Sequence, residues 1–199
     1  MRILATSDLH CDLAATQALV GSAVQADVVV VAGDLATKGQ GAAPLLDLLR
    51  TIPRPVILVP GNHDRLAEMR SYCADWRDGH VLHGDTLRFQ GIAFFGLGAE
   101  IPRRTDEVWN FAMTEPQAAR ALAACPPGAV LVTHTPPKGL CDRQKDGRHE
   151  GSSAILDVLQ NKGPRLHLCG HIHASFGQSA QVRDCPVHNL GPTLSWFTV

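Results

Sequence analysis

Residues 28–34, which read VVVVAGD, constrain the fold of this chain more than any other stretch. Four consecutive valines form a short run that is apolar on both faces, which is typical of a strand buried inside a parallel sheet. The run ends in Ala32, Gly33 and Asp34, so a carboxylate follows the carboxyl end of an interior strand. In open α/β sheets, ligands bind at that end. The sequence therefore predicts a functional site centred on Asp34.

A polar pair follows the first predicted strand in the same way. Residues 2–6 (RILAT) form this strand, and Asp8 and His10 come directly after it. Side chains two residues apart on an extended segment point the same way, so we expect both to reach one point. A helix over residues 13–25 joins this strand to the valine strand. The resulting β-α-β unit predicts that the two strands are parallel.

Three further buried strands, over residues 55–59, 129–132 and 166–169, also end in polar residues. Those residues are Asn62, His63, Asp64, His134, His171 and His173. Carboxylate, imidazole and amide oxygen suit Mn, Fe, Zn or Mg, with Mn favoured, and the absence of a cysteine cluster argues against a thiolate zinc site. All the strand-end ligand candidates except His63 could form two incomplete coordination spheres that share Asp34. These candidates are Asp8, His10, Asp34, Asn62, His134, His171 and His173.

The remaining pattern predicts helices, short strands and two rim loops. We expect helices over residues 44–50, 66–74, 114–124 and 152–161, and strands over 81–82, 87–89, 92–96, 176–182, 185–189 and 193–199. Residues 100–111 and 138–151 lack periodicity and are candidate loops at the rim of the site.

Length and charge exclude several classes of protein. At 199 residues the chain is expected to form one domain over residues 1–199. A net charge of −1 gives no electrostatic footprint for duplex nucleic acid or a membrane. The six cysteines are scattered, and the first strand leads directly into polar residues, so we expect no signal peptide, reduced thiols and a cytoplasmic location.

This donor set suits phosphate-ester chemistry. Two metal ions about 3.5–4 Å apart polarise a phosphoryl group and lower the pKa of a bridging water to give hydroxide. His63 is then free to contact phosphate or to protonate a leaving alkoxide.

The ordered motifs resemble those of the calcineurin-like metallophosphoesterases. They are DxH (Asp8, His10), GD (Gly33, Asp34), GNHD (Gly61 to Asp64), TH (Thr133, His134) and GHxH (Gly170 to His173), and they span most of residues 2–191. The resemblance implies a four-layer αββα sandwich of two mixed sheets flanked by helices. It also implies one metal held by Asp8, His10, Asp34 and His173, and another held by Asp34, Asn62, His134 and His171.

Departures from subfamily patterns narrow the expected substrate. The protein Ser/Thr phosphatases carry phosphate-gripping arginines where this chain has residues 33–39 and 59–61, which contain none. The nuclease branch usually adds domains and basic surface, and this sequence shows neither, so we expect neither a protein phosphatase nor a nuclease. Residues 133–137, 151–152 and 164–173 most resemble a small-phosphodiesterase-like branch that includes the mammalian metallophosphoesterase-domain proteins, which hydrolyse cyclic nucleotides.

We therefore predict a dinuclear metal-dependent phosphoesterase that hydrolyses a small, cyclic nucleotide-like phosphodiester by attack of a metal-bridging hydroxide. His63, Asp34 and Asp64 are the expected catalytic residues; Asp64 supports His63, or instead pairs with Arg65 at the surface. Asn62, His63, Arg143 and Arg148 are candidate substrate contacts, although residues 143–149 could equally be a solvated charge run. The alternatives are a phosphomonoesterase and a non-catalytic interaction scaffold, and the sequence leaves the native metal, natural substrate and oligomeric state open.

Overall fold

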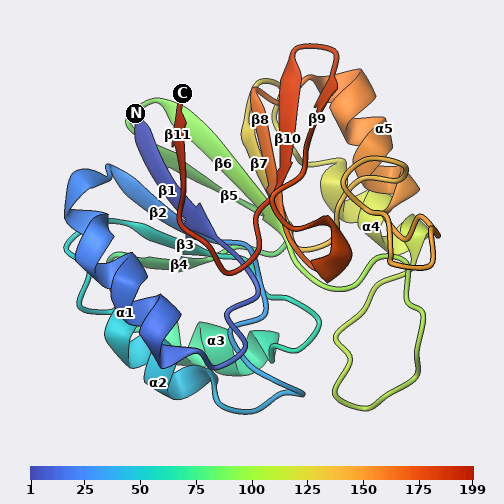
Figure 1. Ribbon diagram of the computed structural model, residues 1–199. Helices are drawn as coiled ribbons and strands as arrows, with labels where there is room; N and C mark the ends of the chain where they lie inside the picture. Colours follow the sequence, from blue (N-terminus) through green and yellow to red (C-terminus); the bar gives the residue numbers. More distant parts are fainter.

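A computed structural model describes all residues from 1 to 199 and contains two mixed sheets that face each other (Figure 1). The first has the strand order β11-β1-β2-β3-β4. Its strands are β1 (Arg2–Thr6), β2 (Val28–Val31), β3 (Val56–Leu58), β4 (Gly79–Val81) and β11 (Ser195–Thr198). Strands β1 to β4 are parallel, and β11 is antiparallel to β1. The predicted β-α-β unit is therefore confirmed.

The second sheet has the strand order β5-β6-β7-β8-β10-β9. Its strands are β5 (Asp85–Phe89), β6 (Ile92–Leu97), β7 (Val130–Thr133), β8 (Leu166–Cys169), β9 (Ser179–Val182) and β10 (Cys185–Asn189). The four central strands are parallel, and an antiparallel strand closes each edge. The hairpin expected for residues 176–182 and 185–189 is present as the pair β9 and β10.

Helices cover the outer face of each sheet (Figure 1). The first sheet carries α1 (Leu13–Ser22), the 3-10 turn η1 (Ala23–Gln25), α2 (Ala42–Leu49) and α3 (Leu66–Cys73). The second carries α4 (Glu115–Leu122) and α5 (Ser153–Lys162), and a short turn, η2 (His173–Ser175), follows β8. All of these helices fall short of the length and apolarity needed to cross a bilayer.

Local sequence explains where the helices begin and end. The Thr114 hydroxyl accepts a hydrogen bond from the Gln117 amide, and the Gln117 side chain binds back to the Thr114 amide, which completes a capping box at α4. Ser152 caps α5 in the same sense, and α5 ends at Gly163 in the left-handed conformation that glycine tolerates best. Helix α2 begins at Ala42, so Pro44 lies in its first turn, where proline is tolerated.

Three apolar clusters fill the spaces between the four layers. One packs α1, α2 and α3 on the first sheet through residues such as Leu19, Leu45 and Met69. A second lies between the sheets and includes Val28, Val30 and Phe94, and a third packs α4 and α5 on the second sheet. The valines of β2 alternate between the first two clusters, so the strand is buried on both faces. The predicted αββα sandwich is confirmed.

Candidate metal centre

The carboxyl ends of five parallel strands meet at one end of the sandwich. Asp8 and His10 follow β1, Asp34 follows β2, Asn62 and His63 follow β3, His134 follows β7, and His171 and His173 follow β8. Asp8, Asp34, Asn62 and His134 are buried. The structure therefore brings the predicted ligands from both sheets to one location.

The backbone turns sharply at these residues. Asp8, His10, Asp34 and His171 have φ angles of 56°, 44°, 56° and 69°. Such left-handed angles are uncommon outside glycine and cluster at functional sites. Asp8 and His10 do converge, as expected, but the segment that carries them is not extended, because both residues have positive φ angles. They converge because their amides bind the carbonyls of Gly33 and Asp34, each at 2.9 Å, which bends the segment after β1 around the turn after β2.

Backbone carbonyls fix the orientation of two imidazoles. Nδ1 of His10 lies 3.2 Å from the Ala36 carbonyl, and Nδ1 of His134 lies 2.9 Å from the Ala32 carbonyl. A carbonyl only accepts, so each Nδ1 carries a proton and donates it. The Nε2 atoms then face Asp34 Oδ2, at 3.6 Å from His10 and 3.4 Å from His134. Asp34 therefore lies between the two imidazoles.

Two groups of ligand atoms are close enough to hold metal ions. The ligand atoms of Asp8, His10 and His173 lie within 4.8 Å of one another, as do those of Asp8, Asp34 and His134. Nε2 of His10 is 3.4 Å from Nε2 of His173, and Nε2 of His173 is 3.6 Å from Asp8 Oδ1. Asp8 belongs to both groups, whereas the resemblance gives the shared position to Asp34.

Asn62 and His171 lie beside the second group. Asn62 Oδ1 is 3.1 Å from His134 Nε2, and the His171 ring is 4.8 Å from the His134 ring. Nε2 of His171 accepts a hydrogen bond from the Arg104 guanidinium and lies 3.8 Å from Glu100. Burial, together with the charges of His134 and Arg104, holds the pKa of His171 well below its ordinary value, so this imidazole is neutral.

The electrostatics of Asp34 and His134 favour a cation between them. Burial opposes the charged form of His134, but the Asp34 carboxylate outweighs burial and raises the pKa of His134 to about 10. Burial also opposes ionisation of Asp34, yet His134 and His63 hold the pKa of that carboxyl well below its usual range. A proton or a divalent ion can supply the positive charge. The carboxylate, imidazole and amide donors therefore fit divalent cations.

Four contacts hold His63 in place. Its Nδ1 accepts a 2.9 Å hydrogen bond from the Lys38 amide, and its own amide donates to Asp34 Oδ1 at 2.8 Å. The Trp109 ring stacks on it at 4.5 Å between ring centroids, with an interplanar angle of 30°. The ring also meets His10 edge-on at 5.0 Å. His63 therefore lies at the edge of the centre, with its Nε2 left without a protein partner.

Asp64 does not make either of its expected contacts. Its carboxylate is buried and accepts hydrogen bonds from the amides of Ala36 and Gly61, each at 2.8 Å. Nδ1 of His63 binds the Lys38 amide instead, and Arg65 lies 3.7 Å from Glu68. Asp64 therefore ties the loops after β2 and β3 together, because two unpaired amides there need a buried acceptor.

The two arginines chosen from the sequence differ in position. Arg148 lines a cavity of about 270 Å³ together with Lys145, Glu150 and His173, and its Nε lies 2.7 Å from Asp146. Arg143 is exposed and is absent from the wall of that cavity. Of the two arginines, only Arg148 therefore shares a cavity wall with a predicted ligand, His173.

Three residues of the loop over 100–111 reach the centre without having been singled out. They are Glu100, Arg104 and Trp109. The loop was expected at the rim, but it has no periodicity and no motif, so nothing in the sequence distinguished these side chains from their neighbours.

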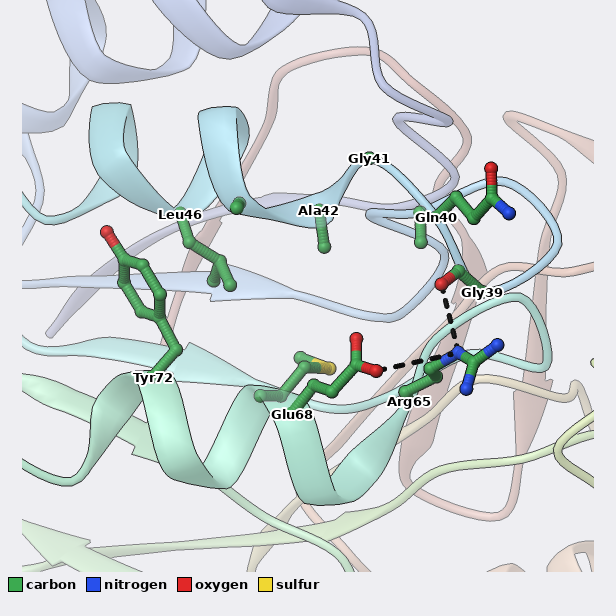
Figure 2. Close-up of a pocket in the computed structure, with 11 residues that line it drawn as sticks. Gly39, Gln40, Gly41, Ala42, Leu46, Arg65, Glu68 and Tyr72 are labelled. Carbon is green, nitrogen blue, oxygen red and sulfur yellow. Dashed lines mark hydrogen bonds and ion pairs between the residues drawn. The ribbon is translucent and has the colours of Figure 1, made fainter.

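A second cavity, of about 330 Å³, lies between α2 and α3 (Figure 2). Leu46, Met69 and Tyr72 form apolar parts of its wall, and Arg65 bounds it where its Nε donates to the Gly39 carbonyl at 3.0 Å. None of the predicted ligands lines it. This cavity is therefore separate from the metal centre, and the loop after β2 forms part of its wall.

An αββα sandwich with carboxylate, imidazole and amide donors at its strand ends defines a metallophosphoesterase fold with a candidate dinuclear centre. The chain belongs to the calcineurin-like phosphoesterase family, whose model matches residues 1–175. That family is dinuclear and metal-dependent, which agrees with the two groups of ligand atoms.

Two curated relatives and one solved structure are similar to this chain. A Mycobacterium tuberculosis (strain CDC 1551 / Oshkosh) protein named cAMP/cGMP dual specificity phosphodiesterase is 26% identical over 163 residues, which cover 77% of this chain and 51% of that protein. Human metallophosphoesterase domain-containing protein 1 is 30% identical over 133 residues, covering 62% of this chain and 36% of that protein. The chain thus spans about half or less of these relatives.

The crystal structure of TT1561 from Thermus thermophilus has a TM-score of 0.79 and 20% identity, and the match covers 98% of this chain and 97% of that one. At this identity the likeness establishes the shared fold.

Proposed function

We propose that the protein is a dinuclear metal-dependent phosphoesterase that hydrolyses a small phosphodiester. The observation that carries the proposal is the position of Asp34, whose Oδ2 faces His10 Nε2 at 3.6 Å and His134 Nε2 at 3.4 Å. A single buried carboxylate between two imidazoles suits a ligand shared by two cations.

Seven residues would hold the ions. One ion would take Asp8, His10, Asp34 and His173, and the other Asp34, Asn62, His134 and His171. When bound, such ions polarise a phosphoryl group and make a water nucleophilic near neutral pH. Asn62 contributes an oxygen without further negative charge, which leaves the centre attractive to an anionic ester.

His63 would supply a proton to the substrate. Because Nδ1 accepts the Lys38 amide, the proton of the neutral ring is on Nε2. Burial lowers the pKa of His63 and outweighs the opposing charge of the Asp34 carboxylate, so the ring is neutral at pH 7. Nε2–H can then donate to a phosphoryl oxygen or to the leaving alkoxide.

The proposed substrate is small and carries a phosphodiester. The cavity beside His173 measures about 270 Å³, a size that suits a compact group, and its wall carries Lys145 and Arg148 together with Asp146 and Glu150. The similarity to a protein named as a cAMP/cGMP phosphodiesterase supports a cyclic nucleotide or a related ester. A net charge of −1 does not favour duplex nucleic acid as the partner.

The test is hydrolysis of bis-p-nitrophenyl phosphate and p-nitrophenyl phosphate by metal-stripped protein, with Mn²⁺, Fe²⁺, Zn²⁺ or Mg²⁺ added back. We expect metal-dependent cleavage of the diester, and a loss of at least about a hundredfold in Asp34→Asn and His63→Ala. Asp75→Asn is the matched control, since Asp75 is exposed and pairs with Arg50. Cleavage of the monoester alone would mean that the protein is a phosphomonoesterase and not a phosphodiesterase. No turnover with any metal, or turnover unchanged in Asp34→Asn, would favour the interaction scaffold.

A further inference from the structure

The loop over residues 100–111 runs between β6 and α4 (Figure 1). Three of its residues contact residues of the candidate centre. The Phe111 amide donates to the Asn62 carbonyl at 2.9 Å. Trp109 stacks on His63, and Arg104 donates to Nε2 of His171. This loop therefore forms a wall over the centre.

A buried carboxylate organises the wall. The Glu100 side chain is 7% exposed. Its Oε2 accepts hydrogen bonds from Asn110 Nδ2 at 2.8 Å and from the Arg104 amide at 3.0 Å, and its Oε1 accepts from Arg104 Nε at 3.0 Å. Glu100 thus holds both ends of the loop and fixes the Nε side of the Arg104 guanidinium.

The other side of this guanidinium meets the second rim loop. Arg104 donates through Nη1 to Glu150, whose Oε2 also accepts from Gln144 Nε2 at 2.7 Å. The Arg104 side chain remains 26% exposed. It is the only arginine or lysine that hydrogen-bonds to the side chain of a predicted metal ligand. A planar guanidinium with donors on two nitrogens matches the oxygens of a phosphoryl group.

We propose that Arg104 binds the phosphoryl oxygens of the substrate, and that Glu150 competes with the substrate for the same guanidinium. This inference rests on the proposed function and names the residue that recognises the phosphate group. Glu100 positions Arg104, because its carboxylate accepts from the Arg104 amide and Nε and lies 3.0 Å from Nη2. Nη1 faces Glu150, and Nη2 also faces His171.

A purely structural ion pair between the two rim loops makes a different prediction. If Arg104 and Glu150 only tied the loops together, removing either partner would break the same bond and would change ligand affinity in the same direction. If Arg104 binds phosphate, removing Arg104 weakens affinity and removing the charge of Glu150 strengthens it. The signs of the two changes in ligand affinity therefore distinguish a phosphate-binding Arg104 from a purely structural ion pair.

The experiment is isothermal titration calorimetry of methylphosphonate, a non-hydrolysable phosphate mimic, into Mn²⁺-loaded protein. We expect Arg104→Ala to weaken binding at least about tenfold, as is typical when a hydrogen bond to a charged group is lost. Glu150→Gln should tighten binding about two- to fivefold, since it removes a competing charge while keeping the side-chain shape. Arg103→Ala is the matched control, because Arg103 is the neighbouring arginine, is half exposed and lies 3.9 Å from Asp106.

Folding is checked by circular dichroism, and Arg104→Lys serves if the alanine variant does not fold. Lysine keeps the charge but loses the planar fork, so we expect a weakening of about threefold or more. Changes of the same sign in Arg104→Ala and Glu150→Gln, or an Arg104 variant that binds like Arg103→Ala, would overturn the inference.

The two proposals can fail separately because methylphosphonate binding requires no turnover. Opposite effects of the two variants without ester hydrolysis would keep the phosphate-binding role and reject the phosphoesterase. Metal-dependent hydrolysis with Arg104→Ala unaffected in both kcat/KM and methylphosphonate binding would keep the enzyme and reject the role of Arg104.

Discussion

The backbone amide of Lys38 donates a 2.9 Å hydrogen bond to Nδ1 of His63. Lys38 lies in the loop after β2 and His63 in the loop after β3, so this bond joins two strand ends. It also determines the tautomer, because an accepting Nδ1 requires the proton of the neutral ring to be on Nε2. The motif that contains His63 carries no sign of this partner, since the donor is a backbone group of another loop.

If His63 protonates the leaving group, the cost of removing it depends on the ester. We expect His63→Ala to reduce kcat for a methyl or phenyl leaving group at least about tenfold more than for p-nitrophenolate, for which the loss reflects the phosphate contact of His63 alone. Steady-state rates on a series of phosphodiesters with different leaving groups measure this directly. An equal loss across the series would assign His63 to phosphate contact alone.

The fold could be predicted from the sequence because apolar period and strand-end chemistry are local. The valines of β2 indicate a strand buried on both faces, and Thr114 and Ser152 indicate the starts of α4 and α5. The observed boundaries differ from those expected where two signals compete. The strand expected over residues 87–89 begins at Asp85, because pairing of Asp85 with Gly96 extends the hairpin.

The predicted metal ligands were brought together, whereas their supporting contacts were not foreseen. The ligand positions follow from motifs in chain order, but their geometry depends on positive φ angles at Asp8 and Asp34 and on carbonyls such as Ala36. These are long-range backbone contacts, so no side-chain pattern encodes them. Arg104 was missed for a similar reason: its position depends on Glu100, a residue with no motif of its own.

Metal binding should stabilise the folded protein. Asp8 and Asp34 are 3% and 2% exposed, so a cation that neutralises them binds the folded chain and has little affinity for the unfolded one. At about a hundred times Kd, added Mn²⁺ should contribute about 2.7 kcal/mol and raise Tm by about 5–10 °C. Differential scanning fluorimetry measures the shift. It should largely disappear in Asp34→Asn and persist in Asp75→Asn, and a shift of equal size in both variants would argue for binding elsewhere.

Glycine at position 61 should be essential to the centre. A Cβ added there would lie 2.7 Å from Asp34 Cγ and would also overlap the Asp34 amide, so Asp34 would have to move. We expect Gly61→Ala to reduce turnover about a hundredfold, as is typical when a reacting group is displaced by about 1 Å. In α1, Gly21 has no atom within 4 Å of an added Cβ. Gly21→Ala should therefore keep full activity and stabilise the protein by about 0.5–1 kcal/mol in urea unfolding. Full activity in Gly61→Ala would show that Asp34 tolerates the shift.

His167 introduces a pH dependence of stability that is independent of the metal centre. On β8 its side chain is fully buried, and its Nε2 donates to the Thr133 hydroxyl at 2.8 Å, since that hydroxyl donates to the Thr135 carbonyl. Its Nδ1 has no partner. Burial lowers the pKa of His167 to about 3, so the folded protein holds this imidazole neutral.

The unfolded chain binds a proton at this position below its ordinary pKa of about 6.5, whereas the folded protein does not do so until about pH 3. The stability contributed by the neutral form is therefore complete above pH 6.5 and is lost as the pH falls towards 3, at about 1.4 kcal/mol per pH unit. Between pH 7 and pH 5 the wild type should lose about 2 kcal/mol more unfolding free energy than His167→Gln, which cannot titrate. Urea unfolding at both pH values measures the difference. Parallel losses in the two proteins would mean that the folded state accommodates a charged His167.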